Sequence, residues 1–321
     1  MSTFKAIRGK AIKSLTSDPS PAAAGEMWYN STSQTLKGVV GIGAWSSSPA
    51  LGTARYGLMG GLGSSTAALA IGGAPAMTTV ESFNGSSWTA VTAYPISAIS
   101  IGAAGTQTAG IAFAGYGPGT TYSTVANTYN GTSWTSIPAL NNGRYLLGSV
   151  GTQTAALAFS GGISGGRSAD SEEWNGSTWT EGNNMINSRE SLGAAGTQTA
   201  ALGFGGNAPG VTADSEEYDG TSWSEGNNIP TATSGIRGSG IQTAALGMGG
   251  NPTTTATIDY NGTSWSANPA TLAVTRYSSG STGAPGGGTS ALVYGGHPTP
   301  VSSATAEVYA LAATTKTFTT S

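Results

Sequence analysis

"AALAFSGG", at residues 155–162, is one of several near-copies of a single phrase in this chain. The phrase returns as "AALAIGG" at 67–73, "AALGFGG" at 200–206 and "AALGMGG" at 244–250. Large and small apolar residues alternate in each copy, and a period of two is typical of a β-strand with both faces covered. The closing glycine pair predicts a crowded point where the backbone leaves the strand.

A second phrase accompanies these strands: an aromatic residue, then Asn-Gly or Asp-Gly, then a tryptophan, as in "YNGTSW" at 129–134. Asn-Gly favours a two-residue hairpin turn. The tryptophans of the series stand 43, 46, 45, 44 and 42 residues apart, and they are Trp45, Trp88, Trp134, Trp179, Trp223 and Trp265. A period in the forties that contains strands is typical of a β-propeller, so an all-β propeller is predicted.

The number of blades follows from the inner strands. Five end in a glycine pair, at Gly73, Gly162, Gly206, Gly250 and Gly296, and a sixth has "FAGYG" (113–117) in its place. The last repeat stops at "AEVYA" (306–310) without its own turn and tryptophan, whereas Trp45 has no strands before it. We therefore expect the strand around Trp45 to complete the sixth blade and close the ring, which would remove an exposed sheet edge. In the alternative closure, "TKTFTT" (315–320) is the last strand and Phe318 replaces the tryptophan.

The glycine pair, aromatic and tryptophan at fixed spacing resemble the kelch repeat over residues 50–310. This resemblance implies a six-bladed kelch-like β-propeller.

Composition limits the functional classes. Only 8% of residues are charged, the formal net charge is −3, and no basic stripe suited to nucleic acid is present. The charges are unevenly spread, with an acidic sector at 160–230 and a mildly basic stretch at 1–37. The chain has no cysteine, no apolar run of membrane-spanning length and no segment like a signal peptide.

Four arginines recur after the tryptophans, at Arg55, Arg144, Arg189 and Arg276. They could surround a channel mouth and hold an anionic sugar or phosphate. Repetition favours a structural role instead, in which they pair with Glu81, Glu172, Glu216 or backbone carbonyls between blades.

Catalytic and metal sites are not indicated. A copper oxidase on a kelch ring would need a cysteine, and the "NGTSW" turns lack the aspartate of a sialidase Asp box. The paired carboxylates of "DSEEW" (170–174) and "DSEEY" (214–218) could bind calcium, but an acidic solvated edge is the favoured explanation. We therefore expect no catalytic residue, no metal and no cofactor.

The segments after the glycine pairs vary in length and composition, whereas the turns at the other end of the strands are nearly constant. Loops on a rigid scaffold commonly carry binding specificity. The candidate ligand contacts in these loops are Tyr116, Tyr122, Arg167, Asp170, Asp214 and His297. Neutral drift in exposed loops is the alternative explanation.

Residues 1–37 lie outside the repeats and are expected to form an arm, with the propeller at 38–321. In the arm, "WYNSTSQTLK" (28–37) predicts a hairpin with Trp28 facing Leu36. The segment resembles one found in bacteriophage tail-fibre and other tail proteins, and the repeat wording is similar to that of kelch-like proteins of marine and cyanobacterial tailed phages. The resemblance implies a virion protein whose arm docks to the tail.

Function is accordingly expected to be non-catalytic: a tail-fibre or tail-tip protein, made in the host cytoplasm, that binds a host-surface glycan or envelope protein. The implied partners are other tail proteins and further copies of the chain, and neither nucleic acid nor membrane insertion is expected. The alternatives are a structural adaptor or decoration protein of the virion and, less favoured, a glycan-processing enzyme.

Overall fold

The computed structural model describes residues 12–19, 26–58, 60, 62–119, 121–282, 287–297 and 302–318. These residues form β-strands and one 3-10 turn, η1 (Gly287–Thr289), and they include no α-helix. No helix in these ranges is therefore long and apolar enough to span a membrane. The all-β expectation is confirmed.

Contacts divide the chain into two units, residues 45–310 and residues 1–44 with 311–321. This division differs from the expected boundary at residues 37 and 38. The end of the chain groups with the first residues because it lies beside them: a Cβ added to Gly41 would lie 3.4 Å from Leu311 Cδ1.

Five four-stranded antiparallel sheets make up most of the 45–310 unit, each with its strands in chain order. Sheet 1 holds β4 (Leu62–Ser64), β5 (Ala67–Ile71), β6 (Val80–Phe83) and β7 (Trp88–Val91). Sheet 2 holds β8 (Gly102–Thr106), β9 (Ala109–Phe113), β12 (Ala126–Tyr129) and β13 (Trp134–Ile137). Sheet 3 holds β14 (Gly148–Gly151), β15 (Ala156–Phe159), β18 (Ser171–Trp174) and β19 (Trp179–Gly182). Sheet 4 holds β20 (Gly193–Thr197), β21 (Ala200–Phe204), β22 (Ser215–Tyr218) and β23 (Trp223–Glu225). Sheet 5 holds β24 (Arg237–Ile241), β25 (Ala244–Met248), β26 (Thr257–Tyr260) and β27 (Trp265–Asn268).

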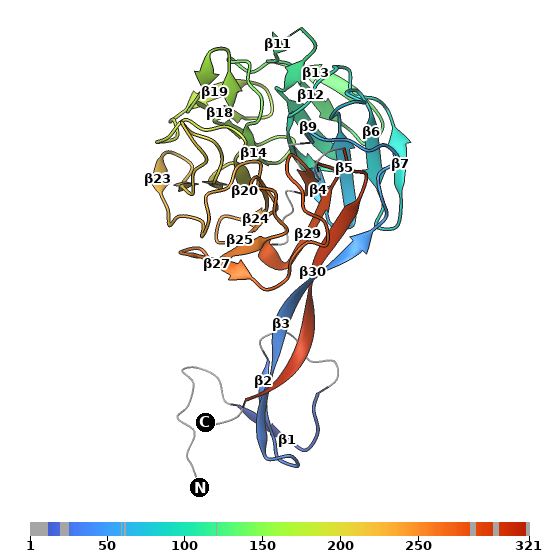
Figure 1. The fold of residues 1–321 in the computed structure, drawn as a ribbon, viewed down its shortest axis with the longest axis vertical. Helices are drawn as coiled ribbons and strands as arrows, with labels where there is room; N and C mark the ends of the chain where they lie inside the picture. The colour runs from blue at the N-terminus through green and yellow to red at the C-terminus, as the bar shows by residue number, and fades with distance from the viewer. Residues whose placement is uncertain are drawn as a thin grey trace. The chain divides into compact units, whose positions relative to one another are not determined.

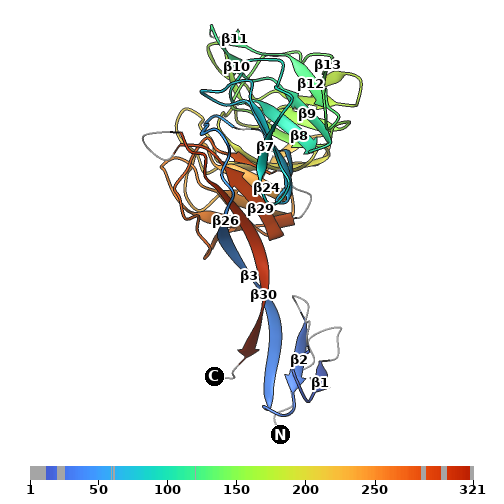
Figure 2. The ribbon, with the colours of Figure 1, turned by 90° about the vertical axis from the view of Figure 1, so that its right-hand side faces the viewer.

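Sheet 6 joins the two ends of the chain, in the order β1-β2-β3-β30-β29-β28. Its strands are β1 (Lys13–Leu15), β2 (Met27–Asn30), β3 (Thr35–Ser48), β30 (Ala306–Phe318), β29 (Ser290–Tyr294) and β28 (Gly280–Ser281). Strands β3 and β30 run side by side (Figures 1 and 2). Strand β30 is continuous from Ala306 to Phe318, so residues 315–318 of "TKTFTT" extend this strand.

The core consists of buried clusters between neighbouring sheets. In Figure 1 the first strands, such as β14, β20 and β24, lie toward the centre of this unit, and β19, β23 and β27 lie at its periphery. One cluster packs Leu157 and Phe159 of sheet 3 against sheet 4, whereas Ala156 and Ala158 belong to the cluster shared with sheet 2. The alternation seen in the sequence therefore directs bulky side chains to one neighbouring sheet and alanines to the other. The architecture is that of a β-propeller-like fold.

The tryptophans hold equivalent places. Each packs on the aromatic that precedes its turn, as Trp223 does on Tyr218 with ring centroids 5.0 Å apart. Trp45 of β3 packs in the same way on Tyr309 of β30, at 5.3 Å. Its indole also donates to Thr257 Oγ1 in sheet 5, as the Trp223 indole donates to Ser171 Oγ in sheet 3.

The turn before each tryptophan differs from the predicted two-residue hairpin. Tyr129 pairs with Trp134, so the loop holds the four residues Asn-Gly-Thr-Ser. Asn130 Oδ1 accepts from the backbone N–H groups of Thr132 and Ser133, and only Gly131 has positive φ (96°). The asparagine side chain thus forms the turn that positive φ at two residues would have formed.

The glycine pairs need one correction. Gly205 and Gly206 both have positive φ (61° and 101°), which supports the predicted backbone turn. In sheet 3 the corresponding residues are Ser160 and Gly161, with φ of 57° and 113°. Gly162 is therefore not the repeat glycine of its sheet; it follows the pair, as Asn207 does in sheet 4.

In the unit of residues 1–44 and 311–321, β2 and β3 form the predicted hairpin, and β1 adds in parallel to β2. The register differs from expectation: Trp28 lies opposite Lys37, and Tyr29 lies opposite Leu36. Asp18 explains the difference because it accepts from the Trp28 indole at 3.0 Å and pairs with Lys37 at 2.7 Å. These bonds require Trp28 and Lys37 to share a face.

Candidate functional site

The variable loops lie at one end of the sheets, which we call the loop face: the connections between second and third strands, with the segments that precede the first strands. Six isolated β-bridges join these two sets of residues. The bridges are Tyr56–Ala74, Ile99–Tyr116, Tyr145–Gly162, Glu190–Asn207, Ser234–Asn251 and Tyr277–His297. They fix the backbone of the loop face at one equivalent point in every sheet.

Three tyrosines gather where sheets 2 and 3 meet. Tyr116 and Tyr122 pair across the small hairpin of β10 (Tyr116–Gly117) and β11 (Thr121–Tyr122), and their rings lie 5.6 Å apart. Tyr145 packs on both, with centroid distances of 5.2 Å to Tyr116 and 5.6 Å to Tyr122. All three side chains are partly exposed. The two predicted tyrosines are therefore brought together with a third that the sequence reasoning missed.

An ion pair adjoins these tyrosines. Arg167 lies on β17 (Gly166–Arg167), which pairs with β16 (Gly162–Ile163), and its Nε is 3.3 Å from Glu190 Oε1. A Cβ on Gly162 would collide with the Tyr145 ring and lie 2.5 Å from Glu190 Oε2. Glycine at this position thus lets Tyr145 and Glu190 approach each other. Partial burial raises the pKa of Tyr145, and the negative charge of Glu190 raises it further.

His297 belongs to a second aromatic cluster, where sheets 6 and 1 meet. Its ring lies 3.9 Å from that of Tyr56 and stacks on Tyr277 at 5.2 Å, an arrangement that needs no metal. The described residues contain no group of three or more His, Cys, Asp or Glu placed to hold a metal ion.

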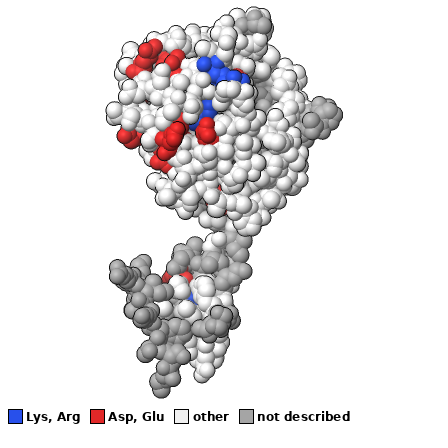
Figure 3. Space-filling view, turned by 60° about the vertical axis from the view of Figure 1, so that its left-hand side comes forward, with Lys and Arg blue, Asp and Glu red and all other residues white. Residues whose placement is uncertain are grey.

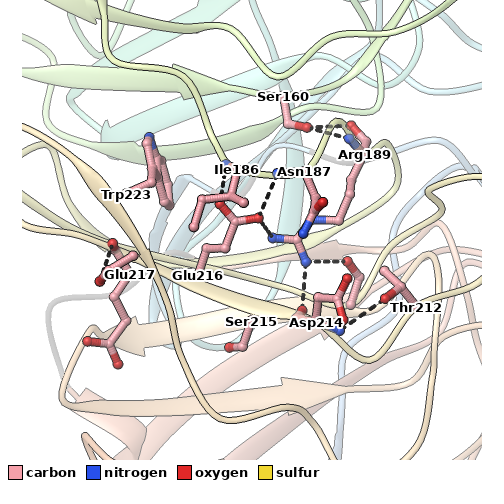
Figure 4. Close-up of polar contacts among 12 residues, drawn as sticks. Ser160, Ile186, Asn187, Arg189, Thr212, Asp214, Ser215, Glu216, Glu217 and Trp223 are labelled. Carbon is pink, nitrogen blue, oxygen red and sulfur yellow. Dashed lines mark hydrogen bonds and ion pairs between the residues drawn. The ribbon is translucent and has the colours of Figure 1, made fainter.

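Asp170 and Asp214 contribute mainly through their backbones. The Asp214 carbonyl accepts from Arg189 Nη1 at 2.6 Å, and the Asp170 carbonyl accepts from Arg144 Nη1 at 2.7 Å (Figure 4 shows the Asp214 contact). The Asp170 carboxylate also accepts from Asn184. Their role as ligand contacts stays a prediction.

The recurring arginines are structural. Arg189 is fully buried, and its Nη2 lies 2.7 Å from Glu216 Oε1 (Figure 4). The same buried pair forms in three other sheets, as Arg55–Glu81, Arg144–Glu172 and Arg276–Glu307. Each pair lies within one sheet and its preceding segment, rather than between blades as predicted. Burial lowers the pKa of Arg189, and the nearby carboxylate of Glu216 offsets part of this shift.

The paired carboxylates of sheets 3 and 4 are also engaged. Glu172 accepts from Arg144, while Glu173 accepts from the Tyr218 hydroxyl of sheet 4. Carboxylates gather on one side of the 45–310 unit, whereas most of the surface there is uncharged (Figure 3). These contacts favour a structural role for the carboxylates over calcium binding.

The missed residues share a signal that the sequence does contain. Tyr56, Tyr145 and Tyr277 each directly follow a recurring arginine, and Glu190 follows Arg189. Because the arginine is anchored in the sheet, the next side chain points out of the framework at the loop face. Aligning the segments between tryptophan and first strand would have identified all four.

Comparison with known proteins supports the fold. No family model matches the chain, and no curated protein matches it. Among solved structures, the chain resembles YjhT with a TM-score of 0.69 and 13% sequence identity, over 81% of this chain and 95% of that one. At this identity the likeness establishes a shared architecture alone.

Proposed function

We propose that sheets 1–6 are the blades of a closed, kelch-like six-bladed propeller in which β3 is the outer strand of sheet 6. The equivalent contacts of Trp45 and Trp223 support this closure. Contacts between sheets 6 and 1 support it as well: the Tyr294 hydroxyl donates to the Leu69 carbonyl, and its ring packs on Trp88.

The proposed function is non-catalytic binding of a host-surface glycan by a component of a bacteriophage tail fibre or tail tip. The observation that carries it is the cluster of Tyr116, Tyr122 and Tyr145 on the loop face. Tyrosines with two side-chain torsions offer large amphipathic contact areas at low entropic cost. Weak contacts of this kind gain strength when several copies act together on one particle.

Virion origin rests on the resemblance of residues 18–38 and of the repeats to phage proteins. In this proposal the arm binds other tail proteins and the loop face binds the host surface. The second candidate function is that of a structural adaptor or decoration protein of the virion. The large uncharged surface visible in Figure 3 favours it.

The first test is immunogold labelling of purified particles with antibody against residues 46–321. Label at the free ends of tail fibres supports receptor binding, whereas label on the capsid or collar refutes it and favours the decoration role. The second test is attachment of the purified full chain to host cells. We expect Tyr145→Ala to weaken attachment at least tenfold.

A matched control is Ile241→Ala, which trims a partly exposed side chain at the opposite end of sheet 5. Equal attachment of both variants would refute the assignment of the tyrosine cluster. Release of free sugar from purified host glycan by the protein would instead favour the enzyme.

A further inference from the structure

Sheet 5 contains an open pocket at the position where sheet 4 has the buried side chains of Arg189 and Glu216. The pocket has a volume of about 340 Å³ and opens on the loop face between exposed Pro230, Thr231 and Pro252. Thr233 and Gly249, which are buried, and the partly buried Ile258 also line it. A volume of this size is at the lower end of the range for small-molecule sites.

The pocket is present because sheet 5 lacks the buried ion pair. Thr233 follows Trp223 by the ten residues that separate Arg189 from Trp179, and Ile258 has the place that Glu216 has in sheet 4. The matching donor is also missing. In sheet 4 the N–H of Ile186 donates to Glu216, whereas its counterpart in sheet 5 is Pro230, which has no N–H. Three linked replacements therefore remove the arginine, the glutamate and a donor together.

Sheet 2 also lacks the buried ion pair, but a tyrosine makes hydrogen bonds in its place. Ala98 and Asn127 stand at the arginine and glutamate positions there, and Pro95 stands at the donor position. Tyr94 compensates: it is buried, and its hydroxyl donates to the Ala112 carbonyl and accepts from Asn127 Nδ2. The residue equivalent to Tyr94 in sheet 5 is Ile229, which is too short to do the same.

The lining of the pocket retains hydrogen-bond acceptors. In sheet 4, Arg189 Nη1 donates to the carbonyls of Gly205 and Asp214, whose counterparts in sheet 5 are Gly249 and Ala256. Within the described part of the chain, no protein group donates to the Gly249 carbonyl. The Ala256 carbonyl accepts only from the Gly249 N–H, at 3.0 Å. A ligand that donates hydrogen bonds would restore both contacts.

The pocket favours a neutral donor over a cation. Ile258 replaces the carboxylate, so a buried ammonium or guanidinium would have no counter-charge. The hydroxyl of Thr254 accepts from the Ala256 N–H, which leaves its own proton for a ligand oxygen. Hydroxyl groups on an apolar ring match this mixture of carbonyls, threonine hydroxyls and apolar walls.

We propose that the pocket of sheet 5 binds a neutral, hydroxyl-bearing ligand of the size of one sugar ring. The proposal rests on the glycan-binding function and supplies it with a specific subsite on the loop face. The tyrosine cluster lies at sheets 2 and 3, so the two sites can be changed separately.

The test is ligand-observed NMR of the full chain with the methyl glycosides of glucose, galactose, mannose and N-acetylglucosamine. Two variants fill the pocket with arrangements taken from other sheets: Thr233→Arg with Ile258→Glu, and Ile229→Tyr with Ile258→Asn. We expect saturation transfer to at least one glycoside, and at least a tenfold loss of affinity in each filled variant that keeps the wild-type circular dichroism. Ile241→Ala, at the opposite end of sheet 5, should retain the affinity.

Absence of transfer to all four glycosides would overturn the proposal, as would binding that the filled variants retain or that Ile241→Ala abolishes. Host attachment separates this result from the proposed function. Loss of glycoside binding with unchanged attachment to cells would leave receptor binding intact and assign it elsewhere on the loop face. Glycoside binding without attachment to any cell would refute the receptor role and leave the pocket established.

Discussion

The buried pair of Arg189 and Glu216 allows a quantitative test of what holds each sheet to its preceding segment. Glu216 accepts from Arg189 Nη2 and from the N–H groups of Ile186 and Asn187, and neither member of the pair is exposed. Glu216→Ile leaves a buried guanidinium without its counter-charge, and Arg189→Thr leaves a buried carboxylate. We expect each single change to lower the free energy of unfolding by about 3–5 kcal/mol.

The double variant Arg189→Thr, Glu216→Ile copies the arrangement that sheet 5 already tolerates. It has no uncompensated charge, and its cost comes from a cavity and two N–H groups without acceptors, about 2–4 kcal/mol together. The two single costs add to about 6–10 kcal/mol. We therefore expect a coupling energy of at least about 2 kcal/mol between the two positions.

Urea unfolding monitored by both tryptophan fluorescence and circular dichroism would measure the cycle, and coincidence of the two signals would justify a two-state treatment. The control cycle is Arg167 with Glu190, whose side chains are 29% and 16% exposed. There we expect a coupling of about 1 kcal/mol or less. A buried-pair coupling no larger than that of the control would refute the structural assignment of the arginines.

Three further predictions concern other parts of the framework. Gln198→Ala removes the hydrogen bonds from its Nε2 to the Ala156 and Trp174 carbonyls of sheet 3, and it should lower the free energy of unfolding in urea by about 1–2 kcal/mol. An unchanged urea midpoint would contradict a role for Gln198 in joining the two sheets. Hydrogen bonds from Lys37, Asn30 and Trp28 lower the pKa of Asp18 to about 2, so its stabilising contribution is present above about pH 4 and is lost as the pH falls through 2. The Trp28 indole NMR resonance should report this transition, and the resonance in Asp18→Asn should not move over the same range. Gly196 has a φ of 111°, and Gly196→Ala places a Cβ against the Ala200 carbonyl. We expect it to lower the melting temperature clearly more than the control Gly165→Ala, where φ is 87° but no atom lies within 4 Å of the added Cβ. Equal melting temperatures of the two variants would contradict the steric argument.

The repeat made the sheets predictable from sequence because the same physical demand recurs in each. Leu157 and Ala158 must alternate if one face meets a bulky neighbour and the other a close one, and the pattern is visible without coordinates. The structural role of the arginines was predictable for the same reason. That their glutamates disappear in the same two sheets would also have been visible in an alignment of the repeats.

Features that depend on the hydrogen bonds or the length of one particular side chain were not predictable from the sequence. The register of the arm hairpin is set by Asp18, ten residues before Trp28, and not by the strand pattern itself. The turn at Asn130 depends on its side chain outcompeting a tighter backbone turn. The pocket of sheet 5 depends on whether residue 229 can reach across a space, which requires coordinates.

Pairing β3 with β30 also imposes an order of events on synthesis. Strand β3 leaves the ribosome well before its neighbour β30, which follows roughly 15–50 s later at about 5–20 residues per second. During that interval the stretch "TLKGVVGIGAWSSS" carries one charge and presents an unpaired edge to other nascent chains. Strand β3 therefore stays without this neighbour until residues 306–318 have been made.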